Sequence, residues 1–373
     1  MKKIFFLLTK YDYPNPCNSF FIDLFKKNFK IFVFGPGYSN LRSYKKTTNY
    51  LKNYTNSSDI IITEHQIMTD NYKSLYSNSI IDFDKKKSFE MLRAMKDFFI
   101  KTKKKKIFFA NFDYFSVPKG LIKNLKISNP IIIHPGIELL NKPSGVNKVL
   151  EKNLHNTSDD FYNYLKKNKN KVISFPFYIS ETESIKKQKK ILDVSVLGSR
   201  YYNRVIFSNS LKKNKTIKYS FKFTKFNVLI KLNRLLKQKK ILIYFRDSFR
   251  KEISKSWISF TCGGILNYPV RKFFEIPFFD SMLICKSPKN FKHLGFKNNI
   301  NFIEVNFTNI NNQINELLKN KVKVKKIINN GKKLILNRHT IKYRSGILKR
   351  SISKILNDKF KGSNWSNGNF YLK

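Results

Sequence analysis

Cysteine, glycine and proline are scarce in this chain, with 3, 13 and 11 occurrences in 373 residues. The three cysteines, Cys17, Cys262 and Cys285, show no CxxC spacing, so neither a disulfide framework nor a cysteine-ligated zinc site is indicated. We expect buried thiols in a reducing compartment and no metal site.

Long apolar runs are also missing. A membrane-spanning helix needs about 18 to 20 apolar residues, and no run approaches that length. The start, MKKIFFLLTKYDY, resembles a signal peptide, but its apolar run at 4–8 is too short and no small-residue cleavage site follows. A first β-strand is predicted there. We expect a cytoplasmic protein, with peripheral contact to the inner face of an anionic membrane as an additional expectation.

Acidic residues are few as well, because 24 Asp and Glu stand against 74 Lys and Arg, giving a formal net charge of +50. The basic residues are mostly lysine, which accompanies abundant Asn, Ile, Phe and Tyr, a set with A/T-rich codons. Mutational bias is one explanation of the charge, and attraction to a membrane surface or an anionic substrate is another. A dedicated nucleic-acid-binding protein more often uses arginine and concentrates its charge, so we expect no specific nucleic-acid partner.

Apolar and aromatic side chains are plentiful, at 41% and 15% of residues, which is enough for a substantial core. Short apolar runs alternate with helix-like segments, such as a helix predicted over 88–106 with Ser88 as its N-cap. Strands that are apolar throughout and separated by helices predict parallel sheets covered on both faces. The predicted strands include 4–8, 30–37, 58–63, 106–113, 130–137, 171–177, 191–199, 258–264 and 281–285.

A polar, lysine-rich stretch at 178–190 separates two such sets of segments. We therefore predict an α/β fold with two Rossmann-like domains, 1–180 and 181–356, that face each other across a cleft. The last helix is expected to cross back to the first domain. Residues 357–373 are expected to form a loose polar tail.

Ligands of open parallel sheets bind beyond the carboxyl ends of the strands, so the turns there are the first candidates. Tyr11 and Asp12 follow the first strand, in the proline-containing loop TKYDYPNP. The alternative interpretation is an ordinary loop whose conformation is limited by its prolines. FGPGYSN at 34–40 has only the first two glycines of a GxGxxG fingerprint, so a nicotinamide cofactor is weakly indicated. His134 ends an apolar strand, where it either faces the cleft or is a structural histidine.

A further strand end, VLGSRYYNR at 196–204, places Gly198 and Ser199 before a helix. The exposed N–H groups at the start of a helix can receive a phosphate, and Arg200 and Arg204 add positive charge. Simple turn chemistry is the alternative explanation of the glycine.

The stretch NYPVRKFFE at 267–275 carries a single carboxylate in the most apolar part of the chain. If Pro269 opens a short helix, Arg271 and Lys272 lie in its first turn and Glu275 lies one turn after Arg271. One interpretation is a structural ion pair. The other is a divided site, in which the cations hold a diphosphate and the carboxylate accepts two hydrogen bonds from a ribose diol.

Several common motifs are absent, namely GxxxxGK[ST], GxSxG and HExxH. DFD at 82–84 matches the short metal-binding motif of one class of sugar transferases, but three residues match easily by chance and three lysines follow directly. We expect no metal there.

The stretch TCGGILNYPVRKFFEIPFFDSMLI resembles the donor-site segment of GT-B glycosyltransferases of the group 1 type, and is similar to their spore-maturation glycosyltransferase-like branch. LLTKYDYPNP, FGPGY, VSVLGSRYYNR and NRHTIKYRSGIL resemble other segments of that branch. The resemblance covers most of residues 1–356. It implies a nucleotide-sugar donor in the C-terminal domain, an acceptor held mainly by the N-terminal one, and chemistry that needs no metal or other cofactor.

The resemblance also implies residue roles. Glu275 would bind the donor ribose, Arg271 or Lys272 would face the diphosphate, and Gly198 with Ser199 would hold its phosphates. The implied donor-binding set is Gly198, Ser199, Arg200, Asn267, Tyr268, Arg271, Lys272 and Glu275. The implied catalytic set is His134, Arg271 and Glu275, and the acceptor side is Tyr11, Asp12 and His134.

Two positions depart from the family pattern. Asn267 stands where many members have a second Glu, and Asp280 stands where the branch tends to have Gly close to the ligand. A carboxylate beside a diphosphate would repel it. The leading hypothesis is transfer of a sugar from a nucleotide-diphosphate donor to a glycan or lipid-linked cell-surface precursor. A catalytically silent GT-B-like protein that binds nucleotide or glycan is the alternative, and a basic nucleic-acid-binding protein is a third.

Overall fold

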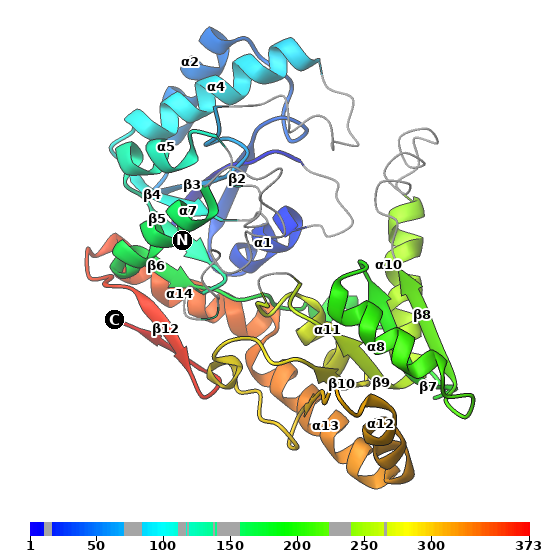
Figure 1. The fold of residues 1–373 in the computed structure, drawn as a ribbon. Coiled ribbons are helices and arrows are strands. Elements are labelled where there is room, and N and C mark those ends of the chain that lie inside the picture. The colour runs from blue at the N-terminus through cyan, green and yellow to red at the C-terminus, as the bar shows by residue number, and fades with distance from the viewer. Residues whose placement is uncertain are drawn as a thin grey trace.

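The computed structural model describes residues 1–10, 17–70, 84–110, 117, 119–136, 139, 157–223, 240–264 and 267–373. They form two parallel β-sheets, each covered by helices (Figure 1). The predicted α/β class with two Rossmann-like domains is confirmed.

The N-terminal sheet has parallel strands in the order β2-β1-β3-β4-β5-β6. All five residues of β3 are buried, because helices cover both faces of the sheet and leave no polar side to the strand. The strands are β1 (Lys3–Leu7), β2 (Lys30–Phe34), β3 (Ile60–Glu64), β4 (Lys105–Phe109), β5 (Ile131–His134) and β6 (Val172–Ser174). The helices are α1 (Cys17–Lys26), α2 (Tyr44–Thr55), α4 (Lys85–Lys101), α5 (Leu121–Ser128) and α7 (Thr157–Lys167), followed by the short 3-10 turn η3 (Lys169–Lys171).

Alternate residues of β1 belong to two separate cores. Phe6 packs on the α1 side, where its ring lies edge-on to Phe21 and Phe25 at 6.1 and 5.2 Å between centroids. Phe5 belongs to the opposite core, which includes buried residues of α2, α4, α5 and α7. The period of two in side-chain direction therefore produces the two layers of the domain.

The C-terminal sheet is also parallel, in the order β11-β10-β9-β7-β8. Its strands are β7 (Leu192–Gly198), β8 (Tyr219–Phe223), β9 (Ser256–Thr261), β10 (Met282–Cys285) and β11 (Ile303–Glu304). The helices are α8 (Tyr202–Lys212), α10 (Lys240–Lys255), α11 (Lys272–Phe278), α12 (Ile310–Lys319), α13 (Lys321–Arg338) and α14 (Ile341–Leu356), with 3-10 turns η4 (Glu181–Glu183) and η5 (Phe291–Leu294). Within the described ranges, every helix is too short or too polar to span a bilayer.

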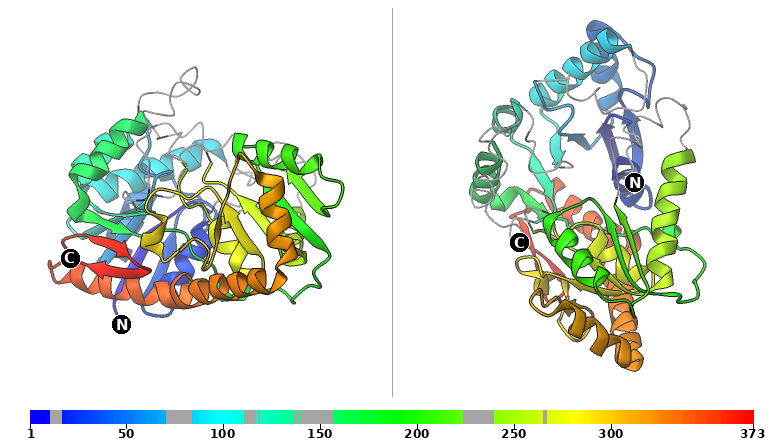
Figure 2. Two further views of the ribbon diagram at one scale, coloured as in Figure 1. Left: turned by 60° about the horizontal axis from the view of Figure 1, so that its bottom comes forward. Right: turned by 45° about the vertical axis from the view of Figure 1, so that its right-hand side comes forward.

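Helices α13 and α14 run one after the other beneath both sheets (Figure 2). Helix α14 packs against α1 of the N-terminal domain, and Asn28 donates a side-chain hydrogen bond to the carbonyl of Ser345 at 3.4 Å. The apolar residues of α14 share one core with the N-terminal sheet and α11, so the two domains are joined by a continuous apolar layer. The domain limits at 180 and 356 stay a prediction.

The expectation of a loose polar tail is wrong. Residues 363–372 form an antiparallel hairpin of β12 (Ser363–Ser366) and β13 (Asn369–Leu372). The side chain of Trp365 is buried, and its Nε1–H donates to the carbonyl of Ser174 at 2.9 Å. The turn is Asn367-Gly368, both with positive φ, which is a strong hairpin signal that the polar composition concealed.

The predicted start of the helix at Ser88 is also wrong. Helix α4 begins at Lys85, and Asp84 is its N-cap, because its carboxylate accepts the backbone N–H of Lys87 at 3.1 Å. Ser88 is buried inside the helix. Asp84, one of the two carboxylates of the DFD motif, therefore has a structural role, and Asp82 lies outside the described residues.

Candidate functional site

Three strands of the C-terminal sheet end side by side. Thr261 at the end of β9 pairs with Cys285 at the end of β10, and Phe260 pairs with Val196 near the end of β7. The turns after these parallel strands therefore lie at one edge of the sheet. Helix α11 begins on the chain segment that follows β9 and brings charged side chains to this edge.

Glu275 lies on α11 with its side chain 14% exposed. Its Oε1 accepts a hydrogen bond from Arg271 Nε at 2.9 Å, and its Oε2 lies 4.0 Å from Lys272 Nζ. No hydrogen bond from the described residues reaches Oε2. Burial by itself raises the pKa of Glu275, but Arg271, Lys272 and Arg250 outweigh it and hold the pKa below its ordinary value. The group is a carboxylate with one oxygen left for a ligand.

Lys272 and Arg204 meet beside Gly198 at the end of β7. A Cβ added to Gly198 would lie 2.9 Å from both Lys272 Cε and Arg204 Nη1, and the φ of Gly198 is +120°. Arg204 is buried, and it donates to the Ser199 carbonyl and to Thr261 Oγ1, each at 3.0 Å. Glycine at 198 is thus favoured by the positive φ, and the absence of a Cβ lets the ends of the Lys272 and Arg204 side chains pack against the backbone.

The pKa of Lys272 is lowered to about 8, chiefly by burial and also by the neighbouring Arg204 and Arg271, whereas Glu275 acts in the opposite direction. The Lys272 side chain is 23% exposed, and its ammonium lies 4.7 Å from the ring centroid of Phe249. It makes no hydrogen bond to the described residues. Lys272 is therefore a partly exposed cation whose pKa lies close to neutral pH.

Arg271, which with Lys272 was a candidate to face a diphosphate, pairs with two carboxylates. Its Nη2 pairs with the carboxylate of Glu183 in the interdomain connection, and its Nε binds Glu275. The guanidinium carbon lies 4.7 Å from the ring centroid of Phe20 on α1. Nε and Nη2 of Arg271 therefore already have carboxylate partners, and the predicted contact of Arg271 or Lys272 with a diphosphate stays a prediction.

Glu183 was not recognised from the sequence, where it lies in the polar stretch 178–190. It is buried, and it pairs with Arg250 of α10 as well as with Arg271. Two carboxylates and four cations therefore gather around α11. We refer to Glu183, Arg204, Arg250, Arg271, Lys272 and Glu275 as the charge cluster.

The loop before α11 is built on unusual backbone. Asn267 has a φ of +45°, and its Nδ2 donates to the carbonyl of Ser287 at 3.0 Å. A Cβ on Gly263 would meet the backbone of 267–268 at 2.5 Å. Tyr268 is buried against the N-terminal core rather than turned outward. Ser199 and the exposed Arg200 lie in the turn before α8.

In the N-terminal domain, His134 ends β5 but its ring is buried. Its Nδ1 accepts the backbone N–H of Gly136 at 3.0 Å, and its ring lies 6.3 Å from that of Phe161. Burial lowers the pKa of His134 to about 3, so the imidazole is neutral. Its catalytic role stays a prediction, and Tyr11 and Asp12 lie outside the described residues.

Glu64 is a second carboxylate that sequence reasoning missed. It ends β3, is buried, and its Oε1 accepts the backbone N–H and the hydroxyl of Thr9, each at 2.8 Å. The sequence signal for Glu64 is a lone carboxylate at the end of a strand that begins with the apolar run 60–62, just as a polar residue at the end of an apolar strand drew attention to His134.

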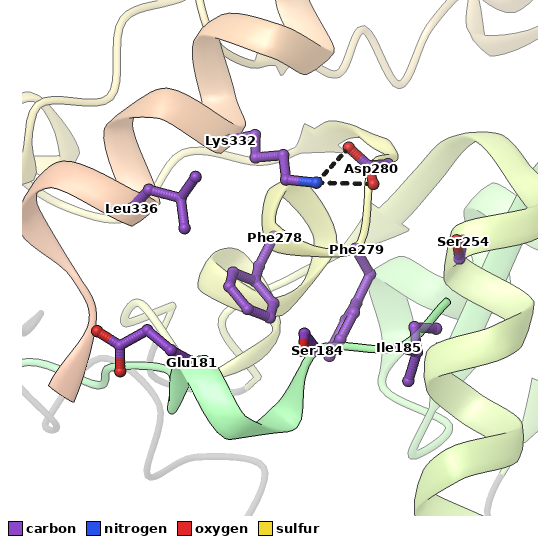
Figure 3. Close-up of a pocket in the computed structure, with 9 residues that line it drawn as sticks. All are labelled: Glu181, Ser184, Ile185, Ser254, Phe278, Phe279, Asp280, Lys332 and Leu336. Atoms are coloured by element: carbon purple, nitrogen blue, oxygen red, sulfur yellow. Dashed lines mark hydrogen bonds and ion pairs between the residues drawn. The ribbon is translucent and has the colours of Figure 1, made fainter. Parts of the chain in front are cut away.

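The position of Asp280 bears on its expected repulsion of a diphosphate. Asp280 precedes β10, at the amino end of the strand, whereas the charge cluster lies beyond the carboxyl ends. Both of its carboxylate oxygens accept hydrogen bonds from Lys332 of α13 at 2.8 Å (Figure 3). Its φ is +62°, which explains why a glycine fits the same turn. Asp280 is therefore paired with a lysine of another helix, and its effect on a bound diphosphate stays a prediction.

Comparison with solved structures agrees with this architecture. HepE from Anabaena in complex with UDP superposes with a TM-score of 0.55 at 10% identity, covering 94% of this chain and 100% of that one. HepE with UDP and glucose gives 0.51 at 10% identity, covering 95% and 100%. A glycosyltransferase from Rickettsia africae gives 0.51 at 12% identity, covering 96% and 99%.

No protein-family model and no curated protein sequence matches the chain. At these identities the likeness is one of fold. It nevertheless extends over nearly the whole of both chains, including both sheets and the helices that join them. The chain has the two-domain α/β fold of GT-B glycosyltransferases.

Proposed function

We propose that this protein transfers a sugar from a nucleotide-diphosphate donor, and that the charge cluster at the carboxyl edge of the C-terminal sheet holds the donor. The observation that carries the proposal is the excess of two positive charges in the cluster, beside a carboxylate with one open oxygen. A nucleoside diphosphate presents two or more negative charges and, on its ribose, a pair of hydroxyl donors. The cations of the cluster complement the diphosphate, and the open carboxylate oxygen complements the ribose hydroxyls.

Each group then has a chemical task. Glu275 accepts hydrogen bonds from the ribose diol through Oε2. Lys272 and the backbone N–H groups around Ser199 and Arg200 bind the diphosphate, with Arg204 fixed beneath them by its bonds to Ser199 and Thr261. The turn at Gly198 lets backbone and cations approach the phosphates closely.

These groups favour bond cleavage at the sugar. When the nucleoside diphosphate departs, negative charge accumulates on the phosphate oxygen and the sugar becomes oxocarbenium-like. Cations and N–H groups that are already in position stabilise that charge without reorganisation. The acceptor would approach from the N-terminal domain, where Tyr11, Asp12 and His134 remain candidates. A glycan or lipid-linked precursor is the proposed acceptor, and membership in the spore-maturation branch is part of the proposal.

Calorimetric titration with UDP, GDP and TDP tests the donor site. UDP is the first probe because HepE was crystallised with it. Replacing Glu275 by Gln removes the charged acceptor of two hydrogen bonds, so we expect affinity to fall about 10- to 100-fold. Glu252→Gln is the matched control, since Glu252 pairs with Lys222 and is 13% exposed. The proposal fails if no nucleotide binds the wild type, or if Glu275→Gln binds as tightly.

A turnover assay distinguishes the proposed enzyme from the alternative, a catalytically silent protein that binds nucleotide or glycan. Asn267 in place of a second carboxylate is the feature that favours it, because that position here holds the loop through Ser287. Incubation with UDP-glucose and release of UDP would show activity. Tight nucleotide binding without release of UDP, with and without a glycan acceptor, would favour a binding protein over an enzyme.

A further inference from the structure

Arg271 connects three parts of the molecule through one guanidinium group. It binds Glu275 on the proposed donor helix, pairs with Glu183 in the connection between the domains, and stacks at 4.7 Å on Phe20 of α1 in the N-terminal domain. Its side chain is 11% exposed. A side chain that contacts both domains and the connection is sensitive to how the domains are arranged.

Glu183 is itself fixed by the connection. One of its oxygens, Oε2, accepts the backbone N–H of Ser180 at 3.0 Å, which closes a capping box around η4. The same carboxylate pairs with Arg250 of α10 and with Arg271. The backbone of the connection and the orientation of Arg271 are thus set by one buried group. The residue before Ser180 ties the connection to the start of α14, because Ile179 N–H donates to the carbonyl of His339 and its own carbonyl accepts the N–H of Ile341.

We propose that Arg271 is a positioning residue rather than a diphosphate ligand, and that the Glu183–Arg271–Glu275 chain couples the interdomain arrangement to donor affinity. The inference rests on the proposed function of Glu275. Arg271 holds Oε1 of Glu275, which leaves Oε2 directed to the ligand, and Glu183 holds Arg271 in that position. The contact with Phe20 conveys movement of the N-terminal domain to the same guanidinium.

Two arrangements of the charges make opposite predictions. If Glu183 only competed with the diphosphate for Arg271, removing the Glu183 charge would free a cation and tighten nucleotide binding. If Glu183 positions Arg271, removing its charge lets the guanidinium move and releases Glu275, so binding weakens. The sign of the change in affinity therefore distinguishes a ligand from a positioning residue.

The first experiment measures UDP, GDP and TDP affinity by calorimetry in Glu183→Gln, Arg271→Lys and Phe20→Leu. We expect Glu183→Gln and Arg271→Lys each to weaken binding about tenfold, since Lys cannot bind two carboxylates through a planar fork. Phe20→Leu should weaken it about threefold, because it removes only the cation–π contact. The double variant Glu183→Gln/Arg271→Lys should bind no more weakly than either single variant. Glu252→Gln should bind like the wild type.

The second experiment needs no nucleotide. Cysteines introduced as Tyr54→Cys on α2 and Val322→Cys on α13 lie on exposed positions of the two domains. Of the three native cysteines, Cys262 and Cys285 are buried and the third is removed by Cys17→Ser. Single-molecule energy transfer between dyes on these cysteines reports the distribution of interdomain distances. We expect Glu183→Gln to broaden that distribution and Glu252→Gln to leave it unchanged.

The outcomes separate the two proposals. Failure of every nucleotide to bind the wild type overturns the proposed function, and the energy-transfer measurement then decides on the interdomain link alone. Nucleotide binding that is equal or tighter in Glu183→Gln overturns the positioning role while leaving the donor site intact. An unchanged distance distribution in Glu183→Gln overturns the interdomain link.

Discussion

At the scale of single residues, burial is the main cause of the lowered pKa of Lys272 in the charge cluster. Lys272 carries its charge next to Arg204 and Arg271, and its pKa is about 8 because a buried ammonium is poorly solvated. In the unfolded chain the same group keeps its ordinary value of about 10.4. Between these two values the unfolded state binds more protons, so this group makes the folded protein more stable as pH rises from 8 to 10.

Nucleotide binding should show the opposite trend. A diphosphate needs the protonated ammonium, so the affinity for UDP should fall by about fourfold between pH 7 and 8.5 as Lys272 loses its proton. Calorimetry at several pH values measures this. Lys272→Arg, which keeps its charge throughout, is the control and should bind UDP with little dependence on pH. A pH dependence that persists in Lys272→Arg would assign the titration to another group.

At the scale of elements, the C-terminal hairpin protects an exposed sheet edge. Strand β6 is the last strand of its sheet, and the backbone N–H and carbonyl of Ser174 bind Ser363 Oγ and Trp365 Nε1 at 2.8 and 2.9 Å. The Trp365 ring also lies 4.1 Å from the guanidinium carbon of Arg344, a buried cation on α14. At its tip, Gly368 donates to the carbonyl of His293 in the other domain at 2.9 Å.

Trp365→Ala should therefore reduce the free energy of unfolding by about 3 to 5 kcal/mol, because it opens a large cavity and removes the nearer of the two aromatic rings, Trp365 and Phe175, that contact the Arg344 guanidinium. Urea unfolding followed by circular dichroism measures the change. Tyr371→Ala on β13 is the control, since Tyr371 is half exposed, and should stay within about 0.5 kcal/mol of wild type. Equal stabilities of the wild type and a chain ending at residue 356 would contradict a structural role for the hairpin.

At the scale of the whole molecule, a formal charge of +50 opposes folding by self-repulsion. Salt screens that repulsion, so the midpoint of thermal unfolding should rise when NaCl increases from about 0.05 to 0.5 M. Differential scanning calorimetry measures the shift.

The same charge should retain the protein on duplex DNA of any sequence at low salt, with release at about 0.2 M. Retention of one sequence above that salt would instead indicate a specific nucleic-acid partner.

The sequence determined the architecture, because the information is local. Apolar runs between helix-like segments, such as 60–62 in the N-terminal sheet and 282–285 in the C-terminal sheet, predicted strands buried on both faces and hence two parallel sheets. The position of Glu275 one turn after Arg271 likewise specified their contact at 2.9 Å. The hairpin also has a local signal, the Asn367-Gly368 pair, but the polar composition of the surrounding residues led to the prediction of a loose tail.

The tertiary structure alone decided which partner each charge takes. Glu183 lies 88 residues from Arg271 along the chain, and Phe20 lies still farther away, so no spacing rule connects them. Asp280 lies at the amino end of β10 and pairs with Lys332, a partner 52 residues away that no spacing rule predicts. Electrostatic and stacking contacts depend on distance in space and on burial, and folding sets both only after the sheets and helices have packed.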